Sequence, residues 1–212
     1  MRLRELFKYL GSGELKHTFV NMFDTTEVDP VHYKELVQHV NLGIQQLHTR
    51  FPLLEKEYIV NLEYGVSTYT LPSDLLRVNV IYDYTGRQLP VNDENASNSV
   101  FLPSTYTLQV PWADGTDISV IYRAIPEDLV IDEDDLDTSL DQEIRVPPYM
   151  NEALFSYIEY RVRKAQGGES AIQLSQVAKQ LFEASCNEIE KRNLTNNGDI
   201  STCVLPELRG FV

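Results

Sequence analysis

The spacing of apolar residues predicts helices in the first quarter of the chain. Between residues 3 and 10 leucine and phenylalanine recur at helical spacing, and Gly11 is a residue type that commonly ends a helix. Asp29 and Pro30 are typical of an N-cap and a first helical turn. The apolar stripe that follows predicts a helix of about twenty residues that ends before Pro52. This stripe consists of Tyr33, Leu36, Val37, Val40, Ile44, Leu47 and Phe51.

Between residues 55 and 124 the apolar positions follow a period of two, which is typical of strands with one buried face. Residues 58–62 and 77–82 predict two such strands, and residues 88–91 are a candidate partner for the second. Residues 106–110 and 118–122 predict a hairpin that turns at Asp114 and Gly115, with Trp112 covering it. The middle of the chain is therefore expected to form a small antiparallel β module.

Helical spacing returns after Pro147 and Pro148. A first helix is expected to end near Gly167 and Gly168, and a second to run from Ser170 to about Arg192. Because the link between them is short, the two helices should pack antiparallel. The positions expected to be buried on the second helix are Ile172, Leu174, Val177, Leu181, Phe182, Cys186 and Ile189.

These patterns predict an α+β protein, mainly a helical bundle with an inserted small antiparallel β module and an extended C-terminal tail. A chain of 212 residues can form such a core without disulfide bonds or structural metals. The expected parts are residues 1–54 (N-terminal helices of the bundle), 55–126 (β insertion), 127–146 (acidic connector), 147–192 (C-terminal helical hairpin completing the bundle) and 193–212 (extended tail).

Composition excludes several classes of protein. Hydrophobic residues make up 42% and charged residues 24% of the chain, which argues against wholesale disorder. No apolar run is long enough for a transmembrane helix, and charges interrupt the apolar positions of the first residues, unlike a signal peptide. Cys186 and Cys203 form no disulfide framework, which favours a reducing compartment such as a cytoplasm.

The charge is strongly negative and unevenly distributed. The chain has 32 acidic and 18 basic residues, a net charge of -14, which argues against a protein that coats DNA. Residues 127–150 hold nine of the acids and a single base, Arg145. Asp132, Asp134 and Glu143 have the spacing of positions 1, 3 and 12 of a calcium-binding loop, but Leu136 and Asp137 occupy positions that such a loop gives to a ligand and a glycine. A solvated loop and a negatively charged functional surface remain the two interpretations.

No pattern indicates catalysis or a cofactor. His32 and His39 lie near one helix face, but no cysteine or acid accompanies them at ligand spacing, so the histidines are expected at surface or boundary positions. The sequence contains no nucleophile elbow and no glycine-rich phosphate loop. We therefore expect neither an enzyme nor a metal centre.

Several segments, in this order, resemble bacteriophage head-to-tail adaptor proteins, the portal-proximal connector or tail tubular protein A-like family. Residues 40–51 are similar to an N-x-G-(I/L)-x-x-L helix pattern, with Asn41 and Gly43 at its fixed positions. Residues 69–74 resemble a Y-x-L-P-x-D strand entry, and residues 118–123 a V-x-Y strand. Residues 152–161 resemble an A-L-x-x-Y-I-x-x-R helix, and a long helix follows that contains residues 178–182. The resemblance covers residues 35–192, and the separate N-terminal helix and the long acidic connector depart from it.

The resemblance implies a structural virion protein made in the host cytoplasm and located at the neck, where head and tail join. Family members form a ring, commonly a dodecamer, that docks on the portal protein, extends the DNA channel and carries the tail nozzle or tube protein. Double-stranded DNA would pass through such a ring transiently and without sequence specificity during ejection, and no membrane partner is implied. Other functions left open are a tail or baseplate component that binds fibres, and a calcium-dependent carbohydrate-binding or enzymatic β module.

Two groups of residues are candidates for contacts in such an assembly. An acidic channel wall would repel DNA, although the same charge facing solvent would keep the free subunit soluble. The tail residues could contact the portal or a neighbouring subunit, or fold back on their own bundle. The candidate channel residues are Asp132, Glu133, Asp134, Asp135, Asp137, Asp141 and Glu143, and the candidate contact residues are Val204, Leu205, Leu208 and Phe211.

Overall fold

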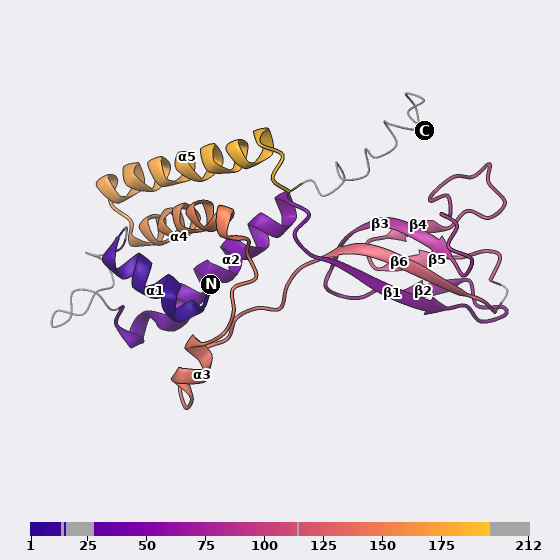
Figure 1. Cartoon of the computed structure of the whole chain (residues 1–212), viewed down its shortest axis with the longest axis horizontal. Coiled ribbons are helices and arrows are strands. Elements are labelled where there is room, and N and C mark those ends of the chain that lie inside the picture. The colour runs from indigo at the N-terminus through magenta and orange to yellow at the C-terminus, as the bar shows by residue number, and fades with distance from the viewer. Residues whose placement is uncertain (14, 16–27, 114, 196–212) are drawn as a thin grey trace, which may run out of the picture. The chain divides into compact units, whose positions relative to one another are not determined.

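The computed structural model describes residues 1–13, 15, 28–113 and 115–195, and it divides the chain into two compact units (Figure 1). Met1–Ile44 and Asp128–Val212 form one unit, here called the helical unit, and Gln45–Glu127 form the other, the β unit. The described chain contains five α-helices and two small antiparallel sheets, which confirms a mixed α+β fold. A predominantly helical bundle is not confirmed, because the β unit builds a core of its own.

The helices agree closely with the apolar stripes. They are α1 (Leu3–Ser12), α2 (Tyr33–Arg50), α3 (Leu136–Leu140), α4 (Asn151–Gln166) and α5 (Glu169–Lys191), with 3-10 turns at Pro30–His32 and Pro148–Met150. The Asp29 side chain accepts a hydrogen bond from the Val31 amide at 3.1 Å, which confirms the predicted cap. The expected end of α1 at Gly11 is wrong, because Gly11 is buried inside the helix and the C-cap falls on Gly13.

A glycine brings α2 and α4 close together. A Cβ atom added to Gly43 would lie 2.7 Å from Leu154 Cδ1 and 3.2 Å from Tyr157 Cδ1. No other residue type leaves this space free, and Leu154 is fully buried at the contact. Large, fully buried side chains of this unit are Leu3, Leu6, Leu10, Leu15, Leu36, Met150, Leu154 and Ile158.

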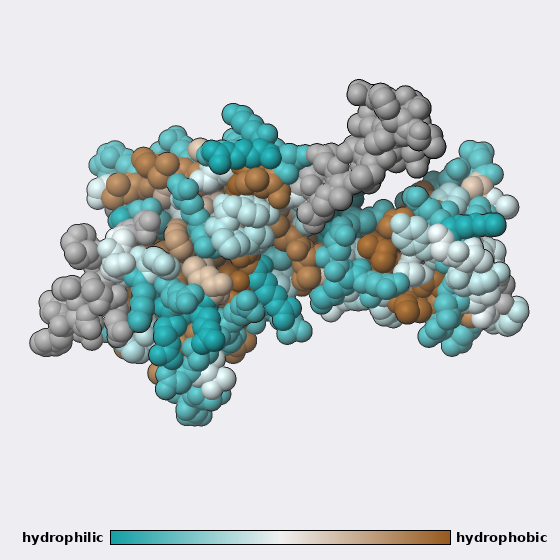
Figure 2. Space-filling view, viewed as in Figure 1, coloured by the Kyte–Doolittle hydropathy of each residue, from teal (hydrophilic) through white to brown (hydrophobic). Residues whose placement is uncertain are grey.

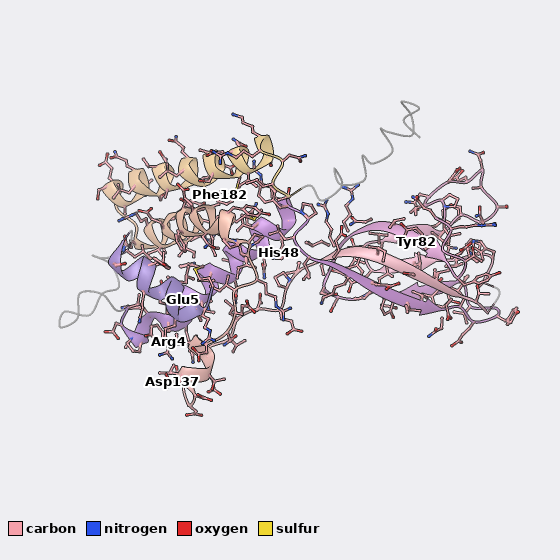
Figure 3. All side chains as sticks on the ribbon, in the orientation of Figure 1. Arg4, Glu5, His48, Tyr82, Asp137 and Phe182 are labelled. Carbon is pink, nitrogen blue, oxygen red and sulfur yellow. The ribbon has the colours of Figure 1, made fainter. Side chains whose placement is uncertain are left out.

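The predicted hairpin of α4 and α5 is confirmed. Gly167 and Gly168 link the helices with φ angles of +69° and +85°, a region that favours glycine. Phe182 of α5 is buried and packs edge-on against Tyr157 of α4, with ring centroids 5.2 Å apart. Figure 3 shows Phe182 on the side of α5 that faces α4.

Part of the α5 stripe is not buried. Leu174, Val177 and Leu181 are 47%, 52% and 52% exposed, and Ile172 is also exposed, so their predicted burial is wrong. The stripe is wider than the surface that α4 covers, and only the side with Phe182 and Cys186 lies in the core. Leu174, Val177 and Leu181 follow each other at three- and four-residue steps and form one row, here called the α5 ridge. Apolar surface is visible along α5 in Figure 2.

The β unit contains two three-stranded antiparallel sheets. One has the order β1 (Glu55–Asn61), β6 (Asp117–Ala124), β3 (Leu75–Asp83), and the other β2 (Thr68–Thr70), β5 (Thr107–Gln109), β4 (Phe101–Ser104). Both sheets contribute to one apolar core. Its buried members include Val60, Ile81, Ile118, Val120 and Tyr122 from the first sheet, Leu108 from the second, and Leu71, Leu89, Val100 and Val110 from connecting segments.

The predicted hairpin of residues 106–110 with 118–122 is wrong. β5 pairs with β2 and β4, whereas β6 pairs with β1 and β3, so the chain crosses from one sheet to the other between them. Alternation shows that one strand face is buried, but it does not specify the pairing partner. Trp112 packs against the shared core, and its indole N–H donates to the Ser99 carbonyl at 3.1 Å.

The Y-x-L-P-x-D segment ties several strands together. The Tyr69 hydroxyl donates to the Val66 carbonyl at 2.8 Å and accepts from the Glu63 amide at 2.9 Å. Asp74 accepts from Lys56 Nζ at 2.6 Å and from the Tyr122 hydroxyl at 3.1 Å. Burial, together with the bond to Asp74, raises the pKa of Tyr122 to about 12, so its hydroxyl keeps the proton. The tyrosine and the aspartate of this motif are structural.

Two histidines of α2 occupy buried environments. His48 is 2% exposed, so the expected surface or boundary position is wrong for this residue. Both ring nitrogens of His39 are buried, and neither has a hydrogen-bond partner among the described residues. Burial lowers the pKa of His39, the charge of Arg161 lowers it further, and Glu35 opposes the shift. The folded protein therefore disfavours the protonated imidazole.

Truncation of a large core side chain should be costly in either unit. Leu47 and Leu154 are both fully buried, so Leu47→Ala and Leu154→Ala should each lower the free energy of unfolding by about 2–5 kcal/mol. Denaturant titration of each variant measures this loss. Unchanged midpoints for both would contradict the assignment of these helix faces to the core.

Acidification should destabilise the helical unit through His39. The unfolded chain takes up a proton near the ordinary histidine pKa of 6.5, and the folded chain resists it, so stability is lost as the pH falls through that value. Thermal unfolding at about pH 7.5 and about pH 5.5 should show a smaller loss for His39→Leu than for the parent chain. An equal loss in both would show that His39 does not contribute.

Candidate functional site

Amide side chains hold the acidic connector where the chain leaves the β unit. Asn41 Nδ2 of α2 donates to the Leu129 carbonyl at 2.9 Å, and the Leu129 amide donates to Asn41 Oδ1 at 3.0 Å. Gln142 pairs with Val130 in the same way. Its Nε2 donates to the Val130 carbonyl at 2.6 Å, and its Oε1 accepts from the Val130 amide at 3.2 Å. Asn41 and Gln142, here called the amide clamp, thus satisfy backbone groups that a strand partner would otherwise satisfy.

The connector contains a short helix that the sequence analysis missed. Asp135 caps α3 by accepting from the Thr138 amide at 3.2 Å, and Leu140 at its other end is buried. The hydrogen bonds from the Thr138 side chain and backbone lower the pKa of Asp135. The Asp132 amide donates to the Ser139 hydroxyl at 2.9 Å, which closes the turn before the helix. The capping aspartate was among the predicted acids, but its role as a cap was not predicted.

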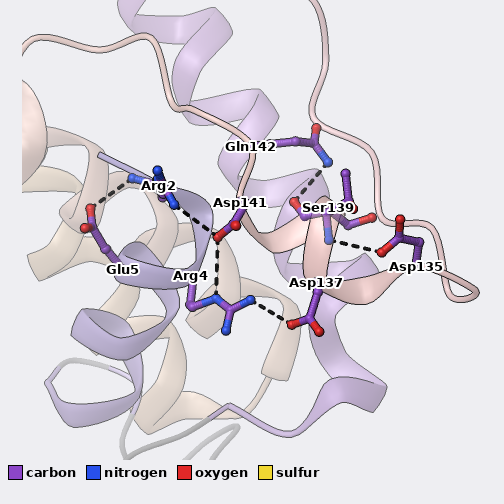
Figure 4. A network of polar contacts seen from close by, with 9 residues as sticks. Arg2, Arg4, Glu5, Asp135, Asp137, Ser139, Asp141 and Gln142 are labelled. Carbon is purple, nitrogen blue, oxygen red and sulfur yellow. Dashed lines mark hydrogen bonds and ion pairs between the residues drawn. The ribbon is translucent and has the colours of Figure 1, made fainter.

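Arginines of the N-terminal segment pair with acids of α3 and its C-terminal end (Figure 4). Arg4 lies 2.8 Å from Asp137 and 3.7 Å from Asp141, and Arg2 lies 3.5 Å from Asp141. The hydrogen bond to Asp137 raises the pKa of Arg4, and Figure 3 labels the two residues next to each other. The backbone of Arg2 also bridges to Glu143. Both α1 and the acidic connector depart from the family resemblance, and these ion pairs bind the two segments to each other.

A further ion pair joins the connector to the start of α2. Lys34 Nζ lies 2.7 Å from a Glu133 carboxylate oxygen, and this hydrogen bond lowers the pKa of Glu133. All these pairs are solvent-exposed, so each contributes little to stability. Their main consequence is electrostatic, because Glu133, Asp137 and Asp141 each have a positive charge beside them.

The acids do not converge on a calcium site. Asp132 Oδ1 accepts from the Asp134 amide at 3.0 Å, while Asp137 and Asp141 turn to arginines. Within the ranges 1–13, 15, 28–113 and 115–195, no cluster of three histidine, cysteine or carboxylate side chains is placed to hold a metal ion. The seven candidate acids instead form an exposed surface over residues 132–143, which can repel an anion or bind a cationic surface.

The other candidate contact residues lie in a different part of the chain. Val204, Leu205, Leu208 and Phe211 fall outside the described residues, as do His17 and Cys203.

The sequence did not predict that Asn41 and Gln142 hold the connector through hydrogen bonds to its backbone. Asn41 stands in the N-x-G pattern, which could have marked it, but no local signal distinguishes Gln142 from other polar residues of the connector.

A comparison with protein families gives a match over most of the chain. A family model described as SU10 adaptor protein matches residues 13–201, which include both units and the connector. The chain belongs to this phage head-to-tail adaptor family. A search of curated proteins found no match.

Membership of the SU10 adaptor family defines the general role of the protein. It is a structural phage component of the virion neck that binds other capsid or tail components, and its family is not typically enzymatic. None of the described helices has the length and apolar character needed to cross a bilayer. In the N-x-G motif that carries the resemblance, Asn41 holds the connector and Gly43 leaves room for α4. Both positions of the motif therefore have structural roles.

Loss of the Asn41 side chain should destabilise the helical unit. Asn41→Ala leaves the Leu129 amide and carbonyl unpaired in a partly buried position, which should lower the free energy of unfolding by about 1–3 kcal/mol. Gln38→Ala, at an exposed position on the same helix, is the matched control and should change it by less than about 0.5 kcal/mol. If Asn41→Ala and Gln38→Ala unfold at the same denaturant concentration, the bonds between Asn41 and Leu129 do not stabilise the helical unit.

Proposed function

We propose that this chain is the head-to-tail adaptor that docks as a ring on the portal protein, extends the DNA channel and carries the tail nozzle or tube protein. The observation that carries the proposal is the family match over residues 13–201, because it includes both units and the connector between them.

Self-association into a ring, commonly a dodecamer in the resembling family, is supported by the α5 ridge. Leu174, Val177 and Leu181 expose an apolar row on α5, beside the narrower face of this helix that is buried. Contiguous exposed apolar surface commonly marks a protein–protein contact. Burial of the ridge in the assembled neck, against another copy or the portal, would remove it from water.

The connector acids support a negatively charged channel wall. Glu133, Asp137 and Asp141 are paired with basic residues, while Asp132, Asp134, Asp135 and Glu143 are exposed and add negative charge to the same surface. Repeated around a ring, such a surface would repel the phosphates of passing double-stranded DNA and discourage binding. Charge-neutralised variants such as Asp132→Asn with Asp134→Asn would reduce this repulsion without changing the ion pairs.

The C-terminal segment is proposed to contact the portal or a neighbouring adaptor. Val204, Leu205, Leu208 and Phe211 recur near the chain end, which a purely solvating segment would not require. A short apolar segment can become ordered on a partner and bury such residues there.

Assembly with portal tests the proposal directly. The net charge of -14 disfavours self-association at low salt, so mass photometry should show the free protein as a monomer or weak oligomer. Mixing it with the portal of the same virus should give a ring beneath the portal in electron micrographs. Deletion of residues 200–212 should leave the melting temperature unchanged and abolish docking.

Three results would count against these statements. Absence of any complex between the intact protein and the portal would contradict the proposed function. Normal docking of the truncated protein would contradict only the role of the C-terminal segment. A stable ring of the free protein at low salt would contradict assembly on the portal.

A further inference from the structure

The outer face of the β1–β6–β3 sheet carries an open groove of about 640 Å³. The inner face of this sheet packs on the core of the β unit through Val60, Val120 and Ile81. On the outer face, Ile59 and Ile121 line the floor of the groove with the rings of Tyr82 and Tyr84. Ile59 is 56% exposed and Tyr84 is 70% exposed, so apolar surface on this face is accessible to a ligand.

The same groove has a negatively charged rim. Glu57, Asp83 and Asp117 line it, and none of the described lining residues is basic. Asp83 accepts hydrogen bonds from the hydroxyl and amide of Thr85 and from the Arg87 amide, so its carboxylate is fixed in position. These bonds and the nearby Arg87 charge lower the pKa of Asp83, which keeps it ionised. Apolar floor and acidic rim together select a ligand that is both aliphatic and basic.

The groove lies beside an open sheet edge. β1 contributes Glu57 and Ile59, and it is an edge strand that pairs with β6 alone over Glu55–Asn61. An extended segment added along such an edge forms main-chain hydrogen bonds and places alternate side chains on the same face. Those side chains would meet Ile59 and Glu57 as cross-strand neighbours.

We infer that this outer face binds an extended segment of the tail nozzle or tube protein whose sheet-facing residues, every second one along the segment, include both aliphatic residues and lysine or arginine. The inference rests on the proposed function, because it assigns the tail partner of the adaptor to a surface of the β unit. Along the β1 edge, the aliphatic residues pack beside Ile59, and the basic residues reach Glu57 and, on the neighbouring strand β6, Asp117.

Charge reversal on the rim, with a matched control, tests the inference. The test variant is Glu57→Lys with Asp117→Lys, and the control is Glu63→Lys with Glu94→Lys, which makes the same change of charge at exposed positions of the same unit outside the groove. Ile59→Thr tests the apolar floor without changing charge. Melting temperatures establish that each variant folds.

Two probes are used at about 0.15 M salt. One is the purified tail nozzle protein of the same virus, added to adaptor–portal complexes. The other is a synthetic peptide that repeats lysine-threonine-valine-threonine, which places lysine and valine on the same face. The test variant should bind both probes at least about tenfold more weakly, Ile59→Thr should also bind more weakly, and the control should match the parent chain. The same peptide with glutamate in place of lysine should not bind.

Failure of the inference is distinguishable from failure of the proposed function. If the test variant binds both probes like the parent chain while portal rings form, the groove is not the tail site and the adaptor function stands. If the parent chain forms no portal complex, the proposed function fails, and the peptide result alone decides whether the groove binds basic segments. Peptide binding without nozzle binding would overturn the choice of partner.

Discussion

The arrangement of the chain depends on the hydrogen bonds between Asn41 and Leu129, which join the two segments of the helical unit where the chain leaves it and returns. The β unit is inserted between Ile44 and Asp128, so the chain must leave the helical unit and return to it at neighbouring positions. Asn41 lies just before the departure, Leu129 just after the return, and two hydrogen bonds of 2.9 and 3.0 Å join them. Because each bond satisfies a backbone group that would otherwise be unpaired, the clamp closes the helical unit independently of what is inserted.

The same junction determines what the acidic connector can do. Ion pairs to Arg2, Arg4 and Lys34 hold it against the N-terminal helices, and hydrogen bonds within α3 fix its capping aspartate. Exposed ion pairs contribute little energy, so the position of the connector depends mainly on the amide clamp and on buried residues such as Leu140. The acids remain exposed on one surface, where Glu133, Asp137 and Asp141 pair with basic residues.

Residues that carry the family resemblance have structural roles in this chain. Gly43 admits Leu154 of α4, and Tyr69 and Asp74 tie the strands of the β unit. The surfaces proposed to meet partners are different ones: the α5 ridge, the connector acids and the groove beside β1. The residues that carry the resemblance are therefore separate from the surfaces proposed to meet partners.

The apolar periods by themselves determined the main helices, the period-two strands at residues 58–62 and 77–82, and the two-glycine hairpin of α4 and α5, because these depend on local spacing and turn chemistry. The tertiary structure decided the rest. Residues 106–110 and 118–122 joined different sheets because alternation is the same for any partner strand. Leu174 and Leu181 stayed exposed, and the connector acids paired with distant arginines and Lys34, because the extent of a covering surface and the approach of remote side chains are set only when the chain is packed.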